Sequence, residues 1–98
     1  MARYLALWEA DYAKIPLDLK ERKAGWAVLL DMVKQDMKKG LIKEYGVFVG
    51  VPNGFSIMEG TEVEVSAAIQ KYIPFFFYKV YPIASIDQVE QVVKGLSK

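Results

Sequence analysis

The sequence predicts an α+β fold: a ferredoxin-like βαββαβ sandwich with an extra C-terminal helix and a four-stranded antiparallel sheet. Apolar residues alternate with a period of two in four short segments and recur at helical spacing in three longer ones. Each helical segment begins with a capping-box pattern. Because these local signals agree with the periodicity, the order β-α-β-β-α-β-α is well specified. The 98 residues are the length of one domain, so we expect a single domain spanning 1–98.

The first strand is predicted over residues 3–9 (RYLALWE), and a loop containing Pro16 follows it. A helix then begins at Asp18, an N-cap residue with a glutamate three positions later. Its apolar positions repeat at helical spacing, lysines crowd its last turn, and Gly40 is the expected C-terminal cap.

The second half of the chain begins with a predicted hairpin. A strand over 41–51 and a strand over 55–59 flank Pro52-Asn53-Gly54, a sequence typical of a tight turn. The next helix opens at a Thr61/Glu64 capping box and ends before Pro74. A fourth strand follows over 75–82.

The last predicted helix opens at a Ser85/Gln88 capping box. Apolar residues at helical spacing form a stripe that we expect to face inward: Ile86, Val89, Val93 and Leu96.

Composition excludes several classes of function. The chain has no cysteine and no histidine, which removes thiolate catalysis, histidine bases and the common zinc ligands. We therefore expect no metal and no organic cofactor. With a net charge of only +1, nucleic acid binding is not expected either. The stretch Asn53 to Glu59 partly matches an RNA-recognition motif, but its basic position and second stacking aromatic are absent.

The chain is rich in apolar residues for its length, at 53%. Because a small domain has limited interior, the surplus apolar surface predicts a homodimer or higher homo-oligomer. No targeting pattern is visible, and the longest apolar run, Tyr72 to Tyr78, is too short to cross a membrane. We expect a cytoplasmic protein with no membrane partner.

The strand patterns suggest how each sheet face is used. We expect the helix-covered face to carry the uniformly apolar set Leu5, Leu7, Val47, Val49, Phe55, Ile57, Phe76 and Val80. The bare face is then expected to carry Tyr4, Ala6, Trp8, Glu44, Phe48, Ser56, Met58, Phe77, Lys79 and Tyr81. This second set is aromatic with a few polar groups, which suits a cavity closed by a partner sheet. A one-residue error in register would exchange the faces of a strand.

The expected bare face supplies the candidate site. Lys79 and Tyr81 could bind an anion and move a proton, and Glu59 could act as a base at the pocket mouth. The expected ligand-binding residues are Tyr4, Trp8, Phe48, Ser56, Met58 and Phe77. Structural interpretations stay open: an edge-strand lysine that discourages aggregation, aromatic side chains at a dimer core, and a glutamate that complements a helix dipole.

Three stretches carry a resemblance to a known family: Tyr4 to Trp8 (YLALW), Gly54 to Glu59 (GFSIME) and Val80 to Ile83 (VYPI). With the predicted order, the chain resembles small members of the dimeric α+β-barrel superfamily, which includes muconolactone isomerases and antibiotic-synthesis monooxygenases. The resemblance implies a homodimer whose sheets pair face to face around a pocket. Haem chemistry is not expected, because the chain has no histidine.

Three hypotheses about function follow. The first is cofactor-independent binding or transformation of a small apolar or aromatic molecule, by an isomerase- or monooxygenase-like enzyme or a ligand-binding relative. The second is a non-catalytic oligomerisation module whose bare sheet face is only an interface. The third is a ligand-sensing domain, with its ligand between protomers.

Overall fold

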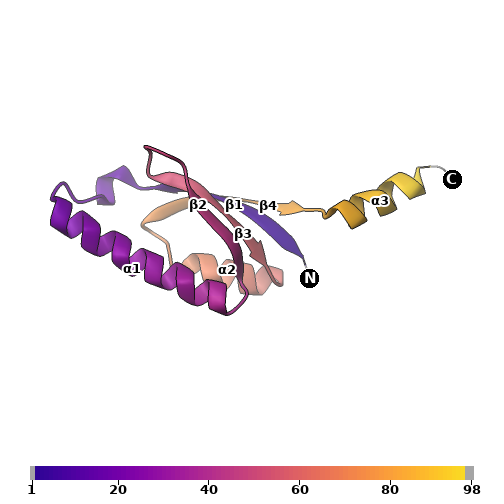
Figure 1. Cartoon of the computed structure of the whole chain (residues 1–98), viewed down its shortest axis with the longest axis horizontal. Coiled ribbons are helices and arrows are strands. Elements are labelled where there is room, and N and C mark those ends of the chain that lie inside the picture. Colours follow the sequence, from indigo (N-terminus) through magenta and orange to yellow (C-terminus); the bar gives the residue numbers. More distant parts are fainter. Residues whose placement is uncertain (1, 97–98) are drawn as a thin grey trace.

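The structure is a computed structural model, and it describes residues 2–96. Figure 1 shows an α+β arrangement in which the elements follow the predicted order, with one 3₁₀ turn added after the first strand. The elements are β1 (Arg3–Ala10), η1 (Tyr12–Lys14), α1 (Leu19–Lys38), β2 (Ile42–Val47), β3 (Asn53–Glu59), α2 (Glu62–Gln70), β4 (Phe76–Ile83) and α3 (Ile86–Gly95).

The four strands form one antiparallel sheet in the order β2-β3-β1-β4. Helices α1 and α2 lie on the same side of this sheet (Figure 1), so the body of the molecule has two layers. Among residues 2–96, no helix or strand lies on the other side of the sheet. This arrangement is consistent with a ferredoxin-like sandwich.

The predicted helix starts are confirmed, with one difference in capping. Thr61 and Ser85 each form a complete capping box, with Glu64 and Gln88 respectively. Asp18 caps α1 by accepting a bond from the backbone N–H of Lys20, and no reciprocal bond from the glutamate of the first turn joins it in the described chain.

The hairpin turn lies earlier than the sequence suggested. Strand β2 ends at Val47, and the chain turns through residues 48–52, where Gly50 has a φ of 84°. Gly54 lies inside β3 instead. A Cβ there would lie 2.0 Å from the carbonyl oxygen of Gly46 and 2.7 Å from the ring of Trp8. Close packing, and not a turn, therefore requires glycine at position 54.

The predicted faces of β1 and β3 are wrong, whereas those assigned to most of β4 are right. Ala6, Trp8 and Met58 are buried beneath the helices. Leu5 and Leu7 pair with Ile57 and Phe55 on the open face, and all four are only partly buried. Both faces of these strands are apolar, so alternation alone could not orient them. The small side chains of Ala6 and Ser56 lie on the face against which the helices pack.

Helix α3 lies apart from the body (Figure 1), and the molecule extends 61 Å along its longest axis. None of its residues is buried. The expected apolar stripe exists, and Val92 widens it, but its members are all exposed: Ile86, Val89, Val92, Val93 and Leu96. The prediction that this stripe faces inward is therefore wrong for a single chain.

Candidate functional site

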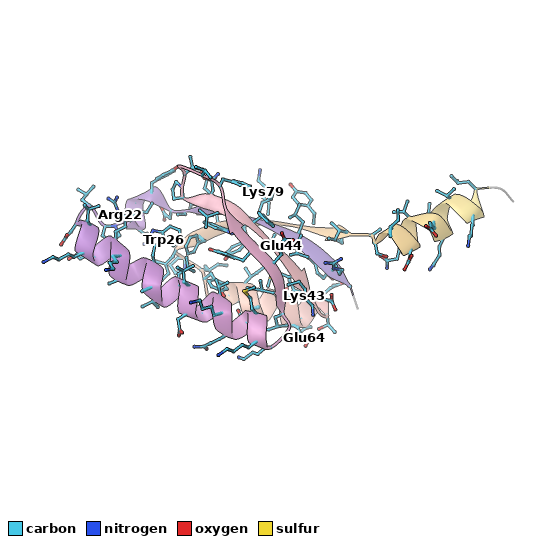
Figure 2. The ribbon with its side chains drawn as sticks, in the orientation of Figure 1. Arg22, Trp26, Lys43, Glu44, Glu64 and Lys79 are labelled. Carbon is cyan, nitrogen blue, oxygen red and sulfur yellow. The ribbon has the colours of Figure 1, made fainter. Side chains whose placement is uncertain are left out.

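A large apolar groove opens on the helix side of the sheet. Its volume is about 790 Å³, and it lies between the first half of α1, the segment around η1, the β2–β3 turn and the start of β4. In Figure 2, Trp26 lies between α1 and the strands, and Arg22 lies near the beginning of that helix. The side chain of Arg22 holds the loop before α1 through bonds to the carbonyl oxygens of Pro16 (3.0 Å) and Leu17 (3.4 Å).

The groove has a buried floor and an exposed rim. Leu29 and Tyr72 are buried floor residues, and Trp26 and Phe76 are partly buried beside them. The rim is apolar but exposed, and it consists of Val28, Phe48, Val49, Val51 and Phe75. Charged residues are few: Asp11, Lys14, Arg22 and Lys71. An apolar concavity with a few polar groups is typical of a small-molecule site.

Aromatic rings stabilise the floor. The ring of Trp8 stacks on Tyr45 with centroids 5.5 Å apart, and it meets Phe76 edge-on at 5.3 Å and Trp26 at 6.4 Å. These rings come from β1, β2, β4 and α1, so they tie the helix layer to the sheet. Aromatic pairs with these geometries stabilise beyond the area they bury.

A polar cluster lies at the inner end of the groove. The carboxylate of Asp36, on α1, is fully buried. It accepts an ion-paired hydrogen bond from Lys71 Nζ and a 2.9 Å bond from the hydroxyl of Tyr72. Both donors line the groove, and the Lys71 side chain is 40% exposed. The cluster therefore connects a buried negative charge to the groove wall through two hydrogen-bond donors.

Burial shifts the titration of the surrounding tyrosines. It raises the pKa of Tyr45 to about 12. The pKa values of Tyr72 and Tyr78 are raised as well, first by burial; for Tyr72 the hydrogen bond to Asp36 adds to the effect. At neutral pH these hydroxyls are therefore protonated donors.

A second, much smaller cavity of about 10 Å³ lies deeper between helices and sheet. Trp8, Ser56 and Met58 line it, and it shares Tyr72 and Phe76 with the groove as walls. Its size is about that of one water molecule. The buried Nε1 of Trp8 has no hydrogen-bond partner among the described residues.

The predicted catalytic residues lie elsewhere. Lys79 and Tyr81 are on the open face of β4, as expected, and Figure 2 shows Lys79 on the side of the sheet away from α1. Glu59 lies on the same open face, where Arg3 pairs with it at 3.7 Å. None of the three lines the groove or the small cavity. Their catalytic roles stay predictions.

The predicted ligand-binding residues divide among four places. Trp8, Ser56 and Met58 meet at the small cavity. Tyr4 also lies on the helix-covered face, packed against the core beside Met58. Phe48 lines the groove and stacks on Phe55, whereas Phe77 is exposed on the open face. The expectation that all six share one bare face is wrong, because β1 and β3 present the opposite sides.

Sequence reasoning missed the polar cluster, although α1 carried a signal of it. Leu29, Val33 and Asp36 follow one another at helical spacing, and all three are buried. A carboxylate on the buried stripe of a helix needs partners within the core. Lys71 and Tyr72 lie 35 and 36 positions away, so no local pattern identified them.

The comparisons with known proteins do not identify a family. No protein-family model matches this sequence, and no curated protein matches it. Within residues 2–96, no three acidic side chains gather into a group that could hold a metal ion. The helices of the same residues are too short or too polar to cross a membrane.

Proposed function

We propose that this chain is a small homo-oligomeric protein that binds a small apolar or aromatic molecule with an anionic group in the groove, without a metal or organic cofactor. The groove itself carries this proposal. Its volume of about 790 Å³ lies within the range of small-molecule sites, and its lining is apolar with few polar groups.

The charges of the groove favour an anionic ligand. The ion pair with buried Asp36 offsets the charge of Lys71. Lys14 and Arg22 then face a single acid, Asp11, so the lining is net positive. The hydroxyl of Tyr72 is neutral at neutral pH and donates its proton to Asp36, so it does not oppose an anion at the inner end.

Binding of a fluorescent aromatic acid tests this proposal. Naphthoate should quench or shift the emission of Trp26, and neutral naphthamide, which has the same ring system, should bind about tenfold more weakly. Lys14→Met should remove most of that preference for the acid. Lys79→Met, the same change on the open face, should leave it unaltered.

Two exposed phenylalanines provide a matched pair for the apolar contact. Phe75 (56% exposed) lines the groove, and Phe77 (60% exposed) lies on the open face. Phe75→Ala should weaken naphthoate binding about tenfold, and Phe77→Ala should not change it. Equal effects of the two substitutions, or no binding to the unsubstituted protein, would reject the groove as the site.

The open face supports a second candidate function, non-catalytic oligomerisation. Leu5, Leu7, Phe55 and Ile57 form an apolar patch in the middle of this face, and Tyr81 extends it. A patch of this kind is typical of a subunit interface. We propose that two sheets pair through it, as in the dimeric α+β-barrel superfamily. Leu7→Lys should then remove the sheet-to-sheet contact and reduce the size of the assembly in sedimentation velocity experiments, and an unchanged assembly would exclude this interface.

A further inference from the structure

Helix α3 presents an apolar stripe that no other described part of its own chain covers. Five apolar side chains gather on one side of the helix and are all exposed: Ile86, Val89, Val92, Val93 and Leu96. Asp87, Glu90 and Lys94 occupy the other side. An isolated helix of ten residues is marginal in water, so α3 needs a surface that receives the stripe.

The groove rim is the complementary surface. It is apolar and exposed, with Val28, Phe48 and Val49 among its members. A helix of ten residues is about 15 Å long and about 10 Å wide. A groove of about 790 Å³ can receive the apolar half of such a helix at its rim and keep its buried floor free.

The helix cannot lay its whole stripe in the groove of its own chain. The groove lies beside Phe76, where β4 begins, whereas α3 follows Ile83, where β4 ends. The eight residues of β4 place its two ends, Phe76 and Ile83, about 23 Å apart. Ala84 and Ser85 are the only link, and two residues span about 7 Å. Folded back along β4, a helix about 15 Å long would bring only its far end level with Phe76, so the stripe as a whole can enter a groove only in another copy.

Charge distinguishes the groove from the open sheet face. Helix α3 has two acids, Asp87 and Glu90, against Lys94, so it is net negative. The groove lining is net positive. The open face has three acids, Glu9, Glu44 and Glu59, against Arg3, Lys79 and the bulge residue Lys43, so it carries no net charge. Opposite charges therefore favour the groove, whereas the open face offers no such attraction.

We infer that α3 of a second copy docks on the rim of the groove, and that two chains exchange these helices. In a two-fold arrangement each chain gives one helix and receives one, which doubles the buried area. The partner's helix then covers the outer part of the groove and closes the site above Tyr72 and Lys71. This inference concerns the rim and stands whether or not a small molecule binds at the floor.

Disulfide trapping tests the exchange, because the chain has no cysteine of its own. Val49→Cys places a thiol on the rim and Val92→Cys places one on the stripe. Mixed and mildly oxidised, these two single-cysteine chains should form a mixed dimer, identified by peptide mass spectrometry. Gln91→Cys, on the polar side of α3, is the control and should cross-link at least about fivefold less with the rim cysteine. If Val92→Cys cross-links more with Lys79→Cys than with Val49→Cys, α3 lies on the open face and the inference is overturned.

Association measurements give an independent readout. Val93→Asp and Gln91→Asp each add one acid to α3, but only the first lies on the stripe. Val93→Asp should raise the dimer dissociation constant at least about tenfold, and Gln91→Asp less than about twofold. Equal effects, or a wild-type protein that stays monomeric at all concentrations, would overturn the exchange.

Discussion

The two faces of the sheet are both apolar, yet they differ in side-chain size and in what covers them. The helix-covered face places Ala6 and Ser56 beside the large ring of Trp8. The open face places Leu7 beside Phe55, and nothing in the described chain covers them. Small residues are needed where helices and aromatic rings must approach the sheet closely. The covered face therefore combines very small with very large side chains, and this mixture, more than hydrophobicity, distinguishes it from the open face.

The largest difference in stability between the two sides of the sheet should come from removing an acid on each side: Asp36 of α1 on the helix side and Glu44 on the open face. Asp36→Ala removes the buried acceptor of Lys71 and Tyr72 and should lower the free energy of unfolding by about 4 kcal/mol. Glu44→Ala, on the exposed open face, should change it by less than about 0.5 kcal/mol. Urea unfolding followed by circular dichroism measures both. Asp36→Asn keeps an acceptor for Tyr72 and should lose less than the alanine variant; equal losses would show that the hydrogen bond to Tyr72 contributes little.

Neighbouring residues on β3 allow a second comparison. Met58 is 2% exposed in the core, and Ile57 points to the open face. Met58→Ala should cost about 3 kcal/mol through the cavity it leaves, and Ile57→Ala about 1 kcal/mol in dilute protein. If the open face pairs with a second copy, the cost of Ile57→Ala should rise with protein concentration. A cost for Met58→Ala no greater than that for Ile57→Ala would contradict the face assignment.

High pH should weaken the helix-covered face first. The folded-state pKa of Tyr45 is about 12 against an ordinary value of 10.0, and those of Tyr72 and Tyr78 are raised in the same direction. The stabilisation from these neutral hydroxyls is complete below pH 10 and is lost as the pH rises through the folded-state values. The free energy of unfolding should therefore be flat up to pH 10 and then decline, less steeply in Tyr45→Phe. Tyrosinate absorbance that saturates near pH 10, with the protein folded, would contradict buried hydroxyls.

The order of elements and most helix starts could be predicted because their signals are local. The Thr61/Glu64 box, for example, lies within four residues and forms as expected. The face of β1 could not be predicted, because both Leu7 and Trp8 are apolar and a two-residue period gives no preference between them. The site could not be predicted for a different reason: Asp36 and Tyr72 meet only through the packing of α1 against the segment after α2.

The smallest expected effect compares two caps of the same type. Thr61 and Ser85 each close a capping box, on α2 and α3 respectively. Thr61→Ala should lower the free energy of unfolding of the body by about 1 kcal/mol, because Val65 and Ile69 of α2 pack in the core. Ser85→Ala should change that free energy in dilute protein by no more than a few tenths of a kcal/mol, because α3 has no buried residue and can fray alone.

Protein concentration sharpens this last comparison. If α3 docks on a second copy, the Ser85→Ala penalty should grow toward that of Thr61→Ala at concentrations where the protein is dimeric, because fraying then opposes association. Urea unfolding at two concentrations, combined with hydrogen exchange of the α3 amides, measures the change. A Ser85→Ala penalty of about 1 kcal/mol in dilute monomer would mean that α3 is coupled to the body of its own chain.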